Sequence, residues 1–297
     1  MVIFLGGIDS SFEKETQDRE SLEWPTPQME LIAALAENAK QLVVVRYGGG
    51  QLDDSELLIN ENVSGLLWGG YPGQSGGQAI MDLLFGKASP AGRLPVTQYP
   101  AWYADVVPPT DMSLRPEKGN SYLGRTYMWY DGATAAPFGF GLHYTTFDVT
   151  IDRTPRWMGH RSIHNGTRLL IQSVKGSADW MELLELPVLQ IPVTVTNTGP
   201  VTSDYVVLLF LKSDAGPSPR PLKTLAAYTR IKDIQPGQFV TRDLTVNLDS
   251  LVRVDLNGDR VLYPGKFDLF VDLDATATFT FKLHGAPLTV ERFPQSK

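Results

Sequence analysis

Three carboxylates and an arginine lie close together near the start of the chain, in a polar loop. The acidic residues are Glu13, Glu15 and Asp18, and Arg19 follows directly. Paired carboxylates suit proton transfer, one as an acid and the other as a base. Glu13 and Glu15 are two residues apart and point opposite ways in an extended segment, so one of them can face a cleft. A solvated acidic loop is the alternative that these residues leave open.

The elements around this loop are typical of an open α/β sheet. Residues 2–5 are apolar and predict a buried strand that ends at a glycine pair, and residues 28–36 predict a helix. Ligands of such sheets bind in the loops beyond the carboxyl ends of the strands, which is where residues 8–19 fall. The sequence therefore places the candidate chemistry at the end of the first strand.

Two more strands and a helix follow. Residues 42–45 form a β-branched run typical of a parallel strand covered on both faces, and residues 63–68 predict a third strand. Residues 74–85 predict a helix that is capped by Ser75 and ended by Gly86. Three strands with crossover helices make part of a parallel sheet, because such sheets commonly have five or six strands.

Residues 87–145 show no clear period and are rich in proline, glycine and aromatic residues. A long connection of this kind usually has a function or wraps between domains. Aromatic faces also suit sugar rings, although packing onto a neighbouring domain is the more frequent role. The aromatic residues are Tyr99, Trp102, Tyr103, Tyr122, Tyr127, Trp129, Tyr130, Phe138, Phe140 and Tyr144.

From residue 147 the sequence predicts an all-β domain. Short strands with turn signals between them are expected over residues 191–196, 205–211, 225–234, 240–248 and 266–273. This spacing indicates an antiparallel sandwich of about seven strands in about 100 residues. Residues 153–181 are irregular and are interpreted as an insertion.

The composition excludes several classes of protein. The chain has 297 residues, a net charge of −7 and no cysteine. It is long enough for two domains, and its charge argues against a nucleic-acid or anionic membrane surface. It has no membrane-spanning run and no signal peptide at its start, and it opens directly inside a strand, which suggests missing upstream sequence. Asn62 and Asn165 are glycosylation acceptors if the protein is secreted.

Other motifs are weaker. Gly48, Gly49 and Gly50 follow a strand but lack the spacing of a phosphate loop, so a tight turn is expected. His160 and His164 are four residues apart without a third ligand or a metalloprotease glutamate. No serine elbow motif is present. No motif therefore indicates a cofactor or a metal site.

The loop and several later segments resemble the family 3 glycoside hydrolases, most closely the fungal β-xylosidases. Residues 7–25 resemble the acid/base loop of that family, and Val193 to Leu211 with residues 262–265 resemble its terminal fibronectin type III-like domain. Together the matches extend over nearly the whole chain. The other matching segments are residues 67–77, 90–97, 110–116 and 138–147.

The resemblance implies a retaining mechanism, in which one carboxylate attacks and another donates and later accepts a proton. It assigns the acid/base role to Glu15, with Glu13 as the second candidate. Asp18 and Arg19 are expected to hold the loop through an ion pair. No residue matches the nucleophile motif, because the barrel that supplies the nucleophile in the family is absent here.

The resemblance thus predicts a partial α/β sandwich domain with a parallel-type sheet over residues 1–146. A fibronectin type III-like β-sandwich follows over residues 147–297, with its core at about 186–284. The expected function is part of a secreted, glycosylated β-xylosidase that acts on xylo-oligosaccharides and is inactive without its N-terminal barrel. β-Glucosides and α-arabinofuranosides remain alternative substrates, and a non-catalytic carbohydrate-binding or interaction module remains an alternative function.

Overall fold

The computed structural model describes residues 1–108, 110–117, 122–152, 155–157, 184–275 and 277–294. The predicted insertion at 153–181 lies outside these residues except for 155–157, as do His160 and His164. The chain divides into two units, one made of residues 1–88 and 93–141 and the other of residues 89–92 and 142–297.

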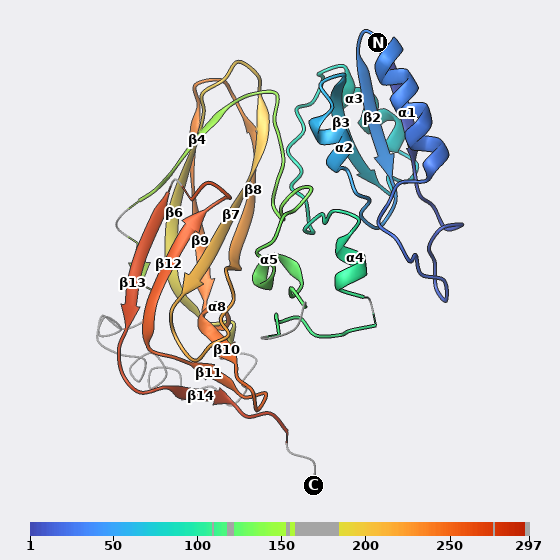
Figure 1. Cartoon of the computed structure of the whole chain (residues 1–297). Coiled ribbons are helices and arrows are strands. Elements are labelled where there is room, and N and C mark those ends of the chain that lie inside the picture. Colours follow the sequence, from blue (N-terminus) through green and yellow to red (C-terminus); the bar gives the residue numbers. More distant parts are fainter. Residues whose placement is uncertain (109, 118–121, 153–154, 158–183, 276, 295–297) are drawn as a thin grey trace. The chain divides into compact units, whose positions relative to one another are not determined.

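The first unit contains the predicted parallel sheet. Its strands are β1 (Val2–Gly7), β2 (Leu42–Tyr47) and β3 (Val63–Gly70), paired in the order β1-β2-β3. Both pairs are parallel, with Val2 opposite Leu42 and Leu42 opposite Val63. The carboxyl ends of all three strands therefore lie at one edge of the sheet (Figure 1). The three predicted strands and their parallel arrangement are confirmed.

Helices connect and cover these strands. They are α1 (Thr26–Asn38), α2 (Ser55–Ile59) and α3 (Gly76–Leu84). Ile32 and Ala36 of α1 pack with Phe4 and Val44 in one buried cluster, which gives the sheet its core on that face. The predicted helix end at Gly86 is confirmed, because Gly86 adopts φ = 70° there. Ser75 occupies the N-cap position of α3, but its side chain makes no capping hydrogen bond, so that detail of the prediction is wrong.

The rest of the first unit is largely irregular, as expected for residues 87–145. It contains only the short helices α4 (Tyr103–Val106) and α5 (Thr126–Trp129) in its described part. A cluster of buried tyrosines, Tyr103, Tyr122 and Tyr130, stabilises this segment in place of regular secondary structure.

The second unit is the predicted sandwich. One sheet has the order β13-β12-β7-β8; the other has β4-β6-β5, with β9 paired to β6. A small third sheet has the order β10-β11-β14. The strands are β4 (Phe147–Ile151), β5 (Arg156–Trp157), β6 (Pro187–Asn197), β7 (Ser203–Ser213), β8 (Thr224–Ile234), β9 (Phe239–Asn247), β10 (Val252–Val254), β11 (Arg260–Leu262), β12 (Gly265–Val271), β13 (Thr278–Leu283) and β14 (Leu288–Glu291), with the helical turn α8 (Leu248–Leu251).

Apolar and polar residues alternate along the strands of the sandwich, so that one face of each sheet is buried. Ile191, Val193 and Val195 of β6 are fully buried and belong to one large apolar cluster, whereas Thr194 and Thr196, on either side of Val195, are only partly buried. All five strands expected in this region are present. β4 pairs with β6 as well, so the sandwich also includes a strand that precedes residue 186.

Candidate active site

The carboxylate loop begins where β1 ends. Gly7 adopts φ = 120°, and the Ile8 amide donates to the Tyr47 carbonyl at 3.0 Å, which ties the loop to the end of β2. Asp9 then accepts hydrogen bonds from the amide and hydroxyl of Ser11, and these bonds lower the pKa of Asp9. The start of the loop is thus fixed by local bonds at the carboxyl edge of the sheet.

The loop then reverses direction. Lys14 and Gln17 exchange backbone hydrogen bonds of 2.9 Å, and Thr16 adopts φ = 71° within the turn. This reversal brings Arg19 back to Glu13, and the two side chains form an ion pair with Nε and Oε2 2.7 Å apart. The loop is therefore closed on itself by a charged pair.

Glu13 is held from a second side. The Gly50 amide, in the loop after β2, donates to Glu13 Oε1 at 3.1 Å. Arg19 also donates through Nη2 to the Gln51 carbonyl at 3.0 Å. Glu13 consequently lies between the loops that follow two neighbouring strands, and its side chain keeps a quarter of its surface exposed.

The other acidic residues of the loop are placed differently. Glu15 and Asp18 are exposed, and neither side chain has a hydrogen bond or ion pair with the described residues. Arg19 does hold the loop through an ion pair, but its partner is Glu13 and not Asp18, so the predicted Asp18–Arg19 pair is wrong. The turn at Lys14–Gln17, which the sequence analysis did not find, explains why Arg19 pairs with Glu13 and not with Asp18.

Gly50 is required by this arrangement. A Cβ atom at Gly50 would lie 2.6 Å from Arg19 Nη2 and 3.0 Å from Glu13 Oε1, which are the ends of flexible side chains. We expect Gly50→Ala to displace the Glu13–Arg19 pair while changing the free energy of unfolding by less than about 1 kcal/mol. The Arg19 Nε–H resonance in NMR spectra reports the pair directly.

The control for this experiment is Gly77→Ala, because a Cβ at Gly77 would meet no atom within 4 Å. That variant should leave the Arg19 resonance unchanged. An unchanged Arg19 resonance in Gly50→Ala would contradict the close packing described here.

A buried charged layer lies beneath the loop. Arg46 of β2 is fully buried, and its Nε lies 3.2 Å from Asp54 Oδ2. Asp54 also accepts from the Trp24 indole at 3.0 Å. Burial raises the pKa of Asp54, and Arg46 and Trp24 oppose this rise. Arg46 Nη1 donates to the Gly50 carbonyl at 3.1 Å, so the layer contacts the residue that binds Glu13.

The glycine-rich segment over residues 68–77 has a structural role. Gly70 and Gly73 adopt φ of 59° and 64°, and α3 begins at Gly76. Trp68 at its start donates to the Gly48 carbonyl at 2.9 Å, and Arg46 Cζ lies 4.6 Å from the centre of its ring. This segment thus completes the packing around the loop after β2.

The aromatic residues of the irregular segment mostly pack on one another. Tyr99 and Tyr103 stack with ring centres 3.8 Å apart, and Tyr130 meets both edge-on at 5.1 Å. Tyr127 stacks on Phe138 at 4.1 Å. These five rings therefore pack on one another within the first unit, and packing onto a neighbouring domain stays a prediction.

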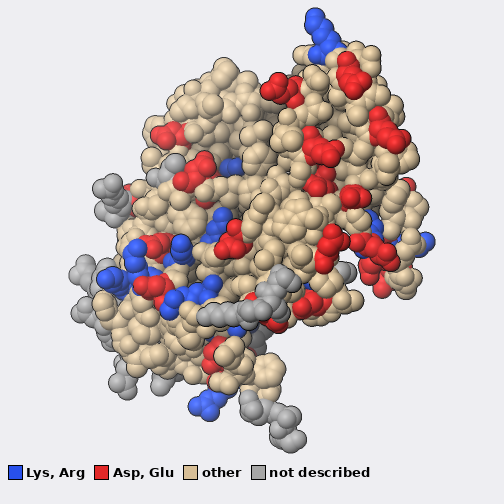
Figure 2. Space-filling view, in the orientation of Figure 1, with Lys and Arg blue, Asp and Glu red and all other residues tan. Residues whose placement is uncertain are grey.

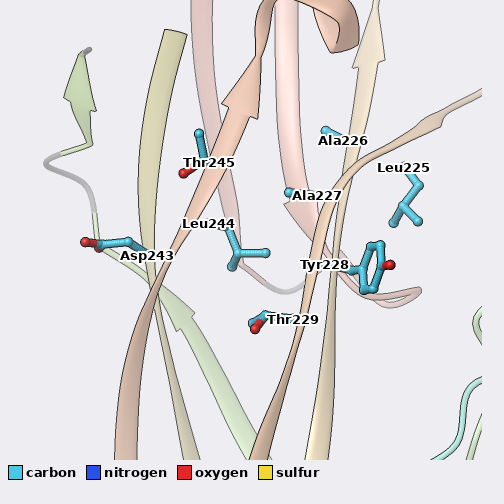
Figure 3. A pocket seen from close by; sticks show the side chains of 8 residues that line it. All are labelled: Leu225, Ala226, Ala227, Tyr228, Thr229, Asp243, Leu244 and Thr245. Atoms are coloured by element: carbon cyan, nitrogen blue, oxygen red, sulfur yellow. The ribbon is translucent and has the colours of Figure 1, made fainter. Parts of the chain in front are cut away.

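The described surface also has a hollow on the second unit, and its charged side chains are unevenly distributed. A hollow of about 410 Å³ lies between β8 and β9, with Tyr228, Thr229, Asp243 and Leu244 among the side chains around it (Figure 3). On the face in Figure 2, acidic side chains are scattered widely and basic ones form smaller groups. The described residues contain no cluster of three or more possible metal ligands and no helix long and apolar enough to cross a membrane.

Comparison with known proteins accounts for both units. Residues 1–144 match the glycosyl hydrolase family 3 C-terminal domain, and residues 205–275 match the fibronectin type III-like domain. The chain is 50% identical over 298 residues to a probable exo-1,4-β-xylosidase of Aspergillus fumigatus, covering 99% of this chain and 37% of the relative. A probable exo-1,4-β-xylosidase of Neosartorya fischeri is 51% identical over 300 residues, with the same coverage of both chains.

Solved structures agree with these matches. A family 3 exo-β-xylosidase in complex with a xylobiose aziridine probe superposes with a TM-score of 0.89 at 39% identity, over 99% of this chain and 37% of that one. The chain thus spans little more than a third of the length of the relatives it matches. The chain thus carries the C-terminal domain of glycosyl hydrolase family 3, followed by a fibronectin type III-like domain.

Proposed function

We propose that the chain is the C-terminal part of a retaining exo-β-xylosidase that removes xylose from xylo-oligosaccharides outside the cell. The observation that carries the proposal is the 50% identity to exo-1,4-β-xylosidases over 99% of the chain. We infer that the nucleophile lies in the part of the enzyme outside this chain, which covers 37% of the same relative. In a retaining glycosidase that carboxylate lies about 5–5.5 Å from the acid/base.

We propose Glu13 as the acid/base in preference to Glu15, which reverses the order implied by the resemblance. Two features of Glu13 support this choice. It is fixed at the carboxyl edge of the sheet, where ligands of such folds bind, by Arg19 and by the Gly50 amide. Its partly exposed carboxylate also leaves room for a substrate oxygen, whereas the freely exposed Glu15 has no group in the described structure to orient it.

The proton transfers follow from this position. Protonated Glu13 gives its proton to the glycosidic oxygen as the nucleophile attacks the anomeric carbon, and ionised Glu13 then removes a proton from the attacking water. Arg19 Nε lies 2.7 Å from Glu13 Oε2 and so stays next to the carboxylate through both steps. Its additional bonds to the carbonyls of Gln51 and Ser21 keep the guanidinium in place when Glu13 takes up a proton.

The isolated chain is expected to show no hydrolysis of p-nitrophenyl β-D-xyloside, because one carboxylate cannot form and break the glycosyl-enzyme bond alone. A hybrid enzyme, made by joining the upstream part of the Aspergillus fumigatus relative to this chain, is expected to release p-nitrophenol and xylose. The same hybrid should distinguish xylosides from glucosides and arabinofuranosides.

Two outcomes contradict the proposal. The first is a hydrolytic rate of the isolated chain that falls in Glu13→Gln or Glu15→Gln, since the chain would then contain its own nucleophile. The second is a hybrid that is monodisperse and folded by circular dichroism but inactive on all three classes of aryl glycoside.

A further inference from the structure

Tyr71 is an exposed aromatic residue next to the candidate active site. It follows Gly70 at the carboxyl end of β3, and 63% of its surface is exposed. Its hydroxyl makes no hydrogen bond with the part of the chain that the structure describes. Such a side chain contributes little to folding, because most of its apolar area stays in water.

The ring is nevertheless held in a defined place. A Cβ atom added to Gly49 would lie 2.7 Å from Tyr71 Cε2, so the ring edge packs directly on the Gly49 backbone. Gly49 precedes Gly50, whose amide donates to Glu13 at 3.1 Å. Because the two glycines share a peptide bond, the ring edge and the Glu13 carboxylate lie at most about 10 Å apart.

We propose that Tyr71 is a sugar-binding platform, on which one ring of a xylo-oligosaccharide stacks while a glycosidic oxygen of the same molecule lies at Glu13. This inference rests on the proposed function and adds a specific binding residue to it. The chemistry fits an uncharged pyranose, whose C–H face packs on an aromatic ring and whose hydroxyls stay in water or reach the tyrosine hydroxyl. A disaccharide can bridge the distance between the ring and the carboxylate.

The test measures the affinity of the full 297-residue chain for xylobiose and xylotriose by NMR chemical-shift titration. Tyr71→Ala is expected to weaken binding about tenfold, the loss typical of removing an aromatic anchor. Tyr71→Trp should retain binding because it keeps the aromatic face. Tyr228→Ala is the matched control, since Tyr228 is 71% exposed and borders the hollow on the other unit.

Each outcome decides the proposal. Tenfold weaker binding in Tyr71→Ala, with Tyr228→Ala unchanged, supports it. No detectable binding by the native chain, equal affinity in Tyr71→Ala, or loss of binding in Tyr228→Ala alone overturns it. Failure of the platform is separate from failure of the proposed function, because the platform is tested by binding of the sugar to this chain, whereas the proposed function is tested by hydrolysis with the hybrid enzyme.

Discussion

Glu13→Gln in the hybrid enzyme is expected to lower kcat/KM for xylobiose by 10²- to 10⁴-fold, the usual contribution of a positioned general acid. The loss should be much smaller for p-nitrophenyl β-D-xyloside, because its leaving group departs without needing a proton. Added azide should restore turnover of the aryl xyloside as xylosyl azide, since azide attacks the glycosyl-enzyme without a general base. Initial rates with both substrates, with and without azide, measure all three effects.

Glu15→Gln provides the matched control, because Glu15 is on the same loop and has no side-chain interaction among the described residues. It should change kcat/KM by less than about threefold. If instead Glu15→Gln shows the large loss and the azide rescue while Glu13→Gln does not, then Glu15 is the acid/base and Glu13 only anchors Arg19.

Arg46→Met is expected to destabilise the first unit by about 3–5 kcal/mol, because it leaves the Asp54 carboxylate buried without its cation. The buried charged layer beneath the carboxylate loop should loosen at the same time, since Arg46 also donates a hydrogen bond to the Gly50 carbonyl. Urea unfolding monitored by hydrogen exchange at the β2 amides separates this transition from unfolding of the sandwich.

An exposed ion pair in the same unit serves as the control for the effect of burial on stability. Lys87 and Asp82 are 3.4 Å apart with 70% of the Lys87 side chain exposed, and Lys87→Met should cost less than about 1 kcal/mol. The double variant Arg46→Met/Asp54→Leu should regain much of the lost stability, because neither charge then remains buried. A loss below about 1 kcal/mol in Arg46→Met alone would show that the pair is not desolvated as described.

The sequence predicts the frame of the site better than the site itself. Two of the strands follow directly from local sequence patterns. The β-branched run at residues 42–45 predicts β2, and the alternation of apolar and polar residues at 191–196 predicts β6. Arg46 closes the same apolar run, and its burial depends on Asp54, eight residues further on and beyond a loop. Local periodicity cannot predict that contact.

The loop shows the same limit at shorter range. Asp18 and Arg19 are neighbours in sequence, but the turn at Lys14–Gln17 directs Arg19 to Glu13, and Gly50 completes the arrangement from 37 residues away. The turn at Lys14–Gln17 has no residue signature, because Thr16 at φ = 71° is an unusual choice for a left-handed position. The ranking of the two glutamates therefore depended on tertiary contacts.

The indole N–H groups of Trp24 and Trp68 can report, by NMR, how firmly the region around Arg46 is closed. The Trp24 N–H is bonded to a buried carboxylate, whereas the Trp68 N–H is bonded to the Gly48 carbonyl at a partly exposed position. Exchange of the Trp24 proton with deuterium therefore requires opening of the charged layer, and that of Trp68 requires only movement of the glycine loop. The exchange rates of the two indole protons, followed in one series of NMR spectra, therefore report separately on opening of the buried charged layer and on movement of the glycine loop.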